Sequence, residues 1–220
     1  MNTTEPSENT DLALLRRLSD LTGVPTKGAS SKRRALADVL RQVAGHVAGL
    51  SEGTDDDLLL ERLTALLATL SMSSAHTTTR FPVPLDFYPL GSHPIVGPAN
   101  AIAPPLELTL ERDSVLLQGS FGPLHEGYPN TVYGGSIASA FDVTVGFAAA
   151  LSGEPVMATE LSVRFVAPVP INAPVHFKAW IESESARDII AVGELTVESD
   201  RAVANARGSF RRVHWRHHRH

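Results

Sequence analysis

One apolar run of small side chains restricts the possible folds of this chain more than any other feature. Residues 134–151 read GGSIASAFDVTVGFAAAL, and small or apolar residues occupy nearly every side of the helix that the run predicts. A helix that is apolar nearly all round must be buried on most of its faces. A sheet that wraps around one central helix would bury it in this way. A single acid, Asp142, interrupts the run.

The segments on both sides of this run alternate apolar and polar residues with the period of a β-strand. Two such segments precede the run and four follow it, at 106–111, 115–121, 156–166, 174–183, 188–198 and 201–213. Strands that succeed one another without intervening helices indicate an antiparallel sheet, because parallel strands need crossover connections. The sequence therefore predicts an α+β domain in which an antiparallel sheet wraps around one central helix.

The N-terminal part of the chain predicts helices. Leucine and valine recur at helical spacing from Asp11 to about Ser74, and we expect three helices, the second at 31–47 and the third from Thr54. Their apolar stripes are expected to be buried, because leucine and valine usually are. The stripe of the second helix comprises Leu36, Val39, Leu40, Val43 and Val47, and that of the third comprises Leu59, Leu60, Leu63, Leu66, Leu67 and Leu70.

A proline-rich segment separates these helices from the strands. Residues 76–105 contain seven prolines, which exclude a helix or a central strand because proline lacks the N–H that both require. The apolar residues between the prolines indicate an extended connector docked on a surface. We therefore expect four regions: a helical segment at 1–75 with its first ten residues disordered, the connector at 76–105, the sheet domain at 106–213, and a His/Arg tail at 214–220.

The composition excludes several classes of protein. The formal net charge of −5 gives no reason to expect nucleic-acid binding. Cysteine is absent, which excludes disulfides, thiolate catalysis and cysteine zinc sites. The N-terminus lacks a basic region before an apolar core, and no stretch approaches the roughly 18 apolar residues of a membrane helix. We therefore expect a cytoplasmic protein that binds neither nucleic acid nor a membrane.

Asp142 and the glycine pair Gly134-Gly135 are the features that point to chemistry. A carboxylate in an apolar setting is costly to desolvate, so it is paired, protonated or kept for a reaction. The glycines would leave free N–H groups at the start of the helix, where a developing negative charge is favoured. The alternative is a structural acid that hydrogen-bonds Thr144 or a neighbouring backbone N–H.

These residues resemble a known family. Gly134-Gly135, followed by Asp142 and by Thr144-Val145-Gly146, is similar to the hotdog-fold acyl-CoA thioesterases of the 4-hydroxybenzoyl-CoA and phenylacetate-pathway superfamily. The segments 94–100, 103–105, 126–129 and 161–168 extend the resemblance, which spans residues 93–213. It implies a hotdog fold, a homodimer or dimer of dimers, and hydrolysis of an acyl-CoA to a free acid and coenzyme A. It implies no cofactor and no metal.

The resemblance also assigns roles to residues. The Gly134 N–H would polarise the thioester carbonyl, since a fixed dipole aimed at an oxyanion is effective in a dry site. Asp142 would act as general base toward water or as a direct nucleophile, on a carbonyl held by the other subunit. The family usually has histidine before the glycines, whereas this chain has Tyr133. A phenol is not a base at neutral pH, so the alternative is a non-catalytic acyl-CoA-binding or scaffold protein.

Several other residues have both a functional and a structural interpretation. Tyr133, Gly135, His125, Asn130 and Thr159 are expected to bind substrate, although a loop histidine or a strand threonine is often only structural. Three C-terminal arginines either meet the phosphates of coenzyme A, as in the family, or are ordinary surface residues. The terminal histidines either bind a metal weakly or form a frayed tail. The arginines are Arg207, Arg211 and Arg212, and the histidines are His214, His217, His218 and His220.

Two other enzyme classes fit the sequence less well. Residues 134–138 nearly match the nucleophile elbow of serine hydrolases, but that elbow must follow a strand of a parallel sheet. A hydratase, the superfamily's other enzyme type, would need an aspartate–histidine pair, and we find none at fitting places in the sequence. The thioesterase interpretation is therefore preferred.

Overall fold

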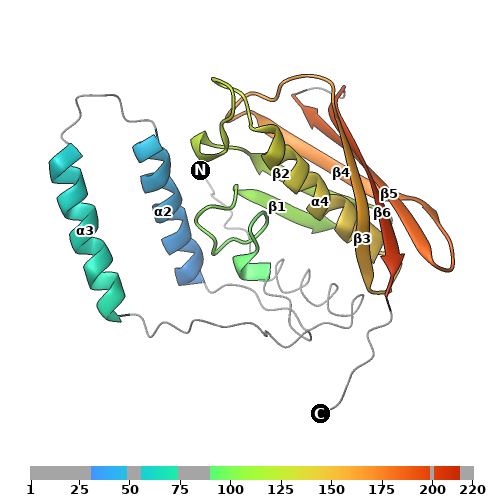
Figure 1. The fold of residues 1–220 in the computed structure, drawn as a ribbon, viewed down its shortest axis with the longest axis horizontal. Coiled ribbons are helices and arrows are strands. Elements are labelled where there is room, and N and C mark those ends of the chain that lie inside the picture. The colour runs from blue at the N-terminus through green and yellow to red at the C-terminus, as the bar shows by residue number, and fades with distance from the viewer. Residues whose placement is uncertain (1–30, 49–55, 74–89, 199–200, 214–220) are drawn as a thin grey trace, which may run out of the picture.

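A computed structural model describes residues 31–48, 56–73, 90–198 and 201–213 (Figure 1). The first of the three expected helices, the expected start of the third at Thr54, connector residues 76–89 and the His/Arg tail at 214–220 lie outside the described residues. Among the described helices, none is both long and apolar enough to cross a membrane.

One six-stranded antiparallel sheet forms the frame of the molecule, in the order β1-β2-β4-β5-β6-β3. Each predicted strand agrees with the observed one within one residue at either end. Because one face of the sheet is buried, apolar and polar residues alternate along each strand. This alternation located the ends of the strands. The strands are β1 Leu106–Leu110, β2 Val115–Ser120, β3 Val156–Phe165, β4 Pro174–Glu184, β5 Asp188–Val197 and β6 Ala202–Arg212.

The long helix α4, Gly134–Ala150, lies on the inner face of this sheet, which curves around it in Figure 1. The helix contacts β2, β3, β4, β5 and β6. Phe141 is fully buried, and its ring meets that of Phe177 edge to face, with centroids 5.0 Å apart. Such pairs are favoured by the ring quadrupole. The predicted hotdog fold, with a sheet wrapped around one central helix, is confirmed.

The N-terminal helices form where the spacing predicted them, but their burial was predicted wrongly. Helix α2 spans Ser31–Ala48 and α3 spans Asp56–Ser73. In α2 only Ala37 is buried, while Val39 is 56% exposed, and in α3 Leu67 is 63% exposed. In Figure 1, α3 stands apart from the sheet, beyond α2. Helical spacing predicts an apolar stripe along one side of a helix, but that stripe is buried only where another element packs against it. The described residues do not supply such an element for these stripes.

The described part of the connector, residues 90–105, is docked on the sheet domain. Leu90 is buried and packs with Phe147 of α4, and Ala103 is buried as well. Arg41 of α2 ties the connector to the helices, because its Nε lies 2.9 Å from the carbonyl oxygen of Ala103 and its Nη2 lies 3.1 Å from that of Asn100. The connector therefore lies between α2 and the sheet domain.

Candidate active site

The start of α4 is built by the loop that precedes it. Tyr133 is the N-cap, and its own N–H donates to the carbonyl of His125 at 2.8 Å. The Tyr133 carbonyl accepts from the N–H groups of Ser136 and Ile137. Within the described residues, the N–H groups of Gly134 and Gly135 have no hydrogen-bond partner. They are the unpaired donors of a helix N-terminus, where negative charge is stabilised.

The ring of Tyr133 lies against Gly135. A Cβ atom on Gly135 would lie 2.3 Å from Cε1 of the Tyr133 ring, so this exposed ring would have to turn aside for any larger residue. A Cβ atom on Gly134 would meet Phe165 at an ordinary 3.5 Å. The second glycine therefore accommodates the tyrosine that this chain has in place of the family histidine. The ring itself stays 61% exposed.

A cavity of about 370 Å³ lies between the connector and the first turns of α4. The connector supplies four of the lining residues, and α4 contributes three small ones. The larger apolar residues of α4, such as Phe141 and Val145, are buried in the core instead. The cavity is lined by Pro94, Ile95, Ile102, Pro104, Phe121, His125, Tyr133, Gly135, Ser136 and Ser139.

Asp142 lies on the same face of α4 as Gly135 and Ser139, because residues four and seven positions apart share one side of a helix. In the single protomer its side chain is exposed, so the expected desolvation does not occur within one chain. Among the described residues it makes no hydrogen bond or ion pair. The hydroxyl of Thr144 donates to the Ala140 carbonyl at 2.6 Å, so it does not serve as the predicted partner of Asp142.

His93 is a site residue that the sequence did not reveal. Burial lowers its pKa, and the carboxylate of Asp142 acts in the opposite direction. His93 precedes Pro94 and Ile95, which line the cavity. The ring Nδ1 lies 3.1 Å from the N–H of Ile95. No local pattern marks a histidine in a proline-rich loop, so sequence reasoning had no signal for it.

His125, a predicted substrate-binding residue, lines the cavity. Its Nε2 lies 3.2 Å from the carbonyl oxygen of Ile102, and its ring stands edge-on to Phe121 at 5.7 Å. Burial lowers the pKa of His125, and the Arg41 charge lowers it further, while the Ile102 carbonyl opposes the shift. The ring is therefore neutral at neutral pH, and it fixes the loop against the connector.

Two predicted substrate-binding residues do not line the cavity. Asn130 adopts a left-handed backbone conformation with φ of 59°, and its N–H donates to the Glu126 carboxylate. Thr159 lies at the irregularity in the pairing of β3 with β6, and its hydroxyl donates to the Ser209 carbonyl at 3.0 Å. The contacts of both residues therefore serve the local backbone.

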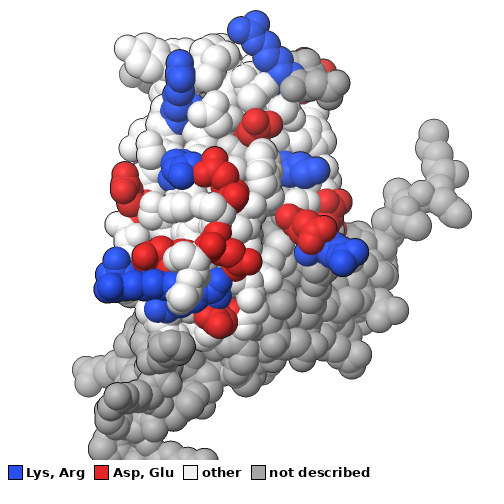
Figure 2. Space-filling view, turned by 90° about the vertical axis from the view of Figure 1, so that its right-hand side faces the viewer, with Lys and Arg blue, Asp and Glu red and all other residues white. Residues whose placement is uncertain are grey.

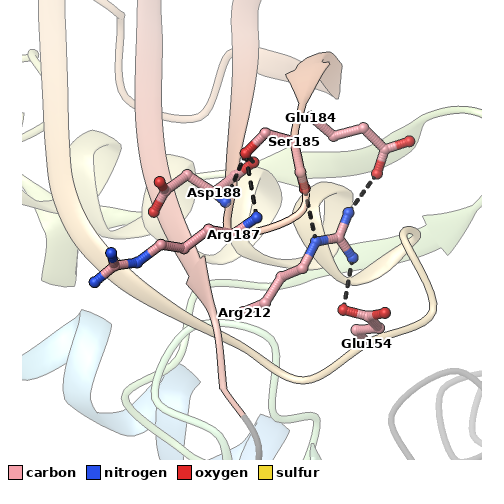
Figure 3. Close-up of polar contacts among 6 residues, drawn as sticks. All are labelled: Glu154, Glu184, Ser185, Arg187, Asp188 and Arg212. Atoms are coloured by element: carbon pink, nitrogen blue, oxygen red, sulfur yellow. Dashed lines mark hydrogen bonds and ion pairs between the residues drawn. The ribbon is translucent and has the colours of Figure 1, made fainter.

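The three C-terminal arginines each pair with carboxylates. Arg207 pairs with Glu182, and Arg211 pairs with Asp188 at 3.3 Å. Arg212 holds Glu154 at 2.8 Å and Glu184 at 2.7 Å (Figure 3). Arg212 also donates to the Ser185 carbonyl, so it joins β6 to the β4–β5 hairpin and to the loop after α4. Figure 2 shows basic and acidic residues interspersed on this side of the molecule. These contacts agree with the structural interpretation of the arginines.

The fold excludes a nucleophile elbow at Ser136. A short 3₁₀ turn, Pro123–His125, and an irregular loop precede α4. The six described strands pair only antiparallel, whereas the elbow needs a strand of a parallel sheet directly before the helix. Ser136 is a first-turn residue that faces the cavity.

Known structures share this architecture. The crystal structure of protein RHA08564, a thioesterase superfamily protein, matches with a TM-score of 0.71 and 24% sequence identity, covering 84% of this chain and 97% of that one. The PaaI protein from the phenylacetic acid degradation operon of E. coli matches with a TM-score of 0.46 and 15% identity, covering 49% and 82%. The TT0310 protein from Thermus thermophilus matches with a TM-score of 0.46 and 22% identity, covering 49% and 92%.

The first match extends beyond the sheet domain, so the shared fold includes part of the N-terminal region. The other two scores are too low to bear on function. A sequence profile of the family described as the thioesterase superfamily matches residues 129–204, which include the unpaired glycine N–H groups and Asp142. With the hotdog architecture, this match supports the similarity of the sheet domain to the thioesterase superfamily.

Proposed function

We propose that the protein hydrolyses an acyl-CoA thioester to a free acid and coenzyme A. The observation that carries this proposal is the cavity at the start of α4, where the N–H groups of Gly134 and Gly135 are unpaired. The Gly134 N–H would hold the thioester oxygen and stabilise its negative charge as the tetrahedral intermediate forms. Asp142 would take a proton from the attacking water, or attack the carbonyl carbon itself. The tetrahedral intermediate then expels the thiolate, which takes up the proton held by Asp142 and leaves as coenzyme A. If Asp142 attacks directly, water must next hydrolyse the acyl–Asp142 anhydride, releasing the free acid and supplying the proton for the thiolate.

The acid that serves each carbonyl would come from a second copy of the chain. Gly134 and Asp142 are two helical turns apart, about 12 Å along the axis, which is too far for one protomer to bring both to one thioester. Asp142 is also exposed in the single protomer, so a facing copy would supply the missing desolvation. We therefore propose a homodimer or a dimer of dimers in which each site uses residues of two subunits.

The edge of the sheet at β3 supports such pairing. β3 is a terminal strand of the sheet, and its Met157 and Phe165 side chains are each 52% exposed. A long, partly apolar edge strand with unpaired backbone groups readily adds another strand. Pairing of β3 with its copy about a two-fold axis would cover this edge, and α4 lies against β3 on the same side of the sheet.

A second candidate, a non-catalytic acyl-CoA-binding protein, is favoured by one observation. The ring of Tyr133 lies over Gly135 and lines the cavity, so it takes part of the space beside the glycine N–H groups. A tyrosine there cannot act as a base at neutral pH. If turnover needs the family histidine, the cavity would bind an acyl group without releasing the thiol.

Thiol release from acyl-CoAs of increasing chain length tests both candidates. We expect the parent to release coenzyme A and Asp142→Ala to lose about 10²- to 10⁴-fold in kcat, the usual contribution of a positioned base. Asp142→Ala should still bind a non-hydrolysable acyl-CoA analogue. Asp113→Ala, in the exposed turn between β1 and β2, is the matched control. Tight binding without release by the parent would establish the second candidate.

A further inference from the structure

A tight turn of the connector around Ile102 is held from α2, from the loop before α4 and from within the turn itself. Arg41 of α2 donates from Nη2 to the Asn100 carbonyl at 3.1 Å and from Nε to the Ala103 carbonyl at 2.9 Å. The Nε2 of His125 lies 3.2 Å from the Ile102 carbonyl oxygen, and it must be the donor because a carbonyl oxygen only accepts. Inside the turn, the side-chain oxygen of Asn100 accepts from the Ile102 N–H at 3.1 Å. The backbone of Ile102 is therefore fixed at both of its polar groups.

The side chain of Ile102 is exposed although its backbone is fixed. It is 70% exposed, whereas the next residue, Ala103, is buried. A single exposed apolar residue is ordinary on a protein surface. Ile102 differs from such a residue because it lines the cavity at the start of α4. The turn therefore keeps an apolar side chain at the cavity instead of in the core.

The chemistry of the cavity favours an acyl group over coenzyme A as its occupant. The ten lining residues include no Lys, Arg, Asp or Glu, so none of them carries a fixed charge that would pair with the phosphates of coenzyme A. An apolar acyl chain, in contrast, needs no polar partner. Gly135 also lines the cavity, so a thioester whose oxygen is held at the glycine N–H groups would have its acyl group there. The connector side of the cavity consists of Pro94, Ile95, Ile102 and Pro104, which are all apolar.

The cavity is also small, and its walls differ in how far they can change. Its volume of about 370 Å³ lies near the lower end of the roughly 300–1,000 Å³ of ligand pockets. Phe121 is fully buried and packs edge to face on Phe177, with ring centroids 6.3 Å apart, so this wall cannot move without disturbing a close-packed core. Ile102 is exposed, so a change in its size alters the cavity and leaves the core intact.

We propose that Ile102 is a specificity-determining residue whose side chain limits the size of the acyl group in this cavity. The inference rests on the proposed function and names its substrate class as acyl-CoAs with compact apolar acyl groups. An acyl chain that starts at the glycine N–H groups would follow the apolar connector wall until it meets Ile102. A compact chain would cover this side chain, whereas a long chain would collide with it or extend into solvent.

Helix α2 would set the width of the cavity through Arg41. The Arg41 side chain is only 16% exposed, and its Nη1 donates to the Asp38 carboxylate at 2.5 Å. This ion pair orients the guanidinium, whose other two nitrogens bind the connector carbonyls. Because α2 also contacts the 3₁₀ turn that ends at His125, both supports of the Ile102 backbone lie in one contact region.

Thiol release from a series of acyl-CoAs tests the proposal. The series runs from acetyl-CoA through butyryl-CoA and octanoyl-CoA to palmitoyl-CoA, and kcat/KM of the parent should fall steeply between the last two. Ile102→Ala should raise the ratio of kcat/KM for palmitoyl-CoA over butyryl-CoA by about 10-fold or more, and Ile102→Trp should lower it by a similar factor. One methylene in an apolar pocket is worth about 10- to 200-fold. Leu60→Ala, on α3 and 66% exposed, is the matched control and should leave the ratio unchanged.

Binding measures the same preference without turnover. Isothermal titration with the non-hydrolysable thioether analogues of the same acyl-CoAs should give the same order of Kd and the same shifts in the two Ile102 variants. A parent that binds with these shifts but releases no thiol contradicts the proposed function and leaves the role of Ile102 standing. A chain-length preference that is equal in the parent, Ile102→Ala and Ile102→Trp overturns that role, and so does a parent that binds no analogue.

Two further measurements separate the side chain from its alternatives. Loss of a dimer in sedimentation of Ile102→Ala, with an unchanged acyl preference, would show that a second copy of the chain covers Ile102 and would overturn the proposal. Arg41→Ala should raise the palmitoyl ratio in the same direction as Ile102→Ala, because the turn loses two of its hydrogen bonds. Arg62→Ala, on exposed α3, is the control. An unchanged ratio in Arg41→Ala would overturn the role of α2.

Discussion

Helices α3 and α4 have nearly the same length, 18 and 17 residues, and both are apolar, yet they lie in opposite environments. In α4, Phe141 and Val145 are fully buried against the sheet. In α3, Leu67 is exposed, and no leucine of known exposure is fully buried. The sequence of an apolar helix therefore does not show which other elements, if any, will pack against it and bury it. The cover of α4 comes from strands of the same domain, whereas the described residues provide none for α3.

The largest expected effect compares one residue from each helix. Phe141→Ala should destabilise the protein by about 3–5 kcal/mol, because it removes a buried ring and leaves a cavity among packed side chains. Leu67→Ala should change stability by less than about 0.5 kcal/mol, as surface substitutions usually do. Urea unfolding followed by circular dichroism measures both values. A loss of several kcal/mol in Leu67→Ala would show that α3 is covered in solution.

The start of α4 allows a test of one N–H group. Gly134→Pro removes that N–H, and proline is well tolerated at the first position of a helix, after the extended backbone of Tyr133. We expect kcat for thiol release to fall about 10²- to 10³-fold, the effect of losing one oxyanion donor, with little change in thermal stability. Gly134→Ala is the matched control, because it keeps the N–H and its Cβ makes only an ordinary contact with Phe165. Equal activity in the two variants would exclude the Gly134 N–H from the reaction.

The comparison of the two helices also explains what the sequence could predict. The six strands and α4 were located within one residue because local alternation and composition decide them, as in the clean pattern of Glu160 to Phe165. The wall of the cavity could not be predicted, because Pro94 and Ile102 come from a connector with no periodicity. The exposure of Leu67 likewise depends on tertiary packing.

The contact of Arg41 in α2 with the connector is expected to contribute a smaller amount to the stability of the protein. Arg41→Ala removes a charged donor from the carbonyls of Asn100 and Ala103, so we expect a loss of about 1.5–3 kcal/mol and faster hydrogen exchange at Gly97 and Ala99. Arg62→Ala, on exposed α3, is the matched control and should be nearly neutral. Unchanged exchange in Arg41→Ala would show that the connector holds its place without α2.

The smallest expected effect is a loss of folding stability as the solution is acidified. His93 and His125 both lie where the connector meets the sheet domain, and burial lowers the pKa of each. Between the ordinary histidine pKa and the lowered one, the unfolded chain binds more protons than the folded chain, so stability must rise with pH and fall as the solution is acidified through this range. Both rings are partly exposed, so the slope should be shallow. In unfolding experiments between about pH 5 and 7.5, His93→Asn should flatten the slope, because its side chain does not titrate there. His176→Asn should leave the slope as in the parent.

Acid should also open the contact of the connector with the sheet domain before it unfolds the core around Phe141, because both perturbed histidines lie at that contact and no charged side chain is buried among the described core residues. Hydrogen exchange that accelerates first at residues 93–103 would support this order, and simultaneous acceleration in α4 would contradict it.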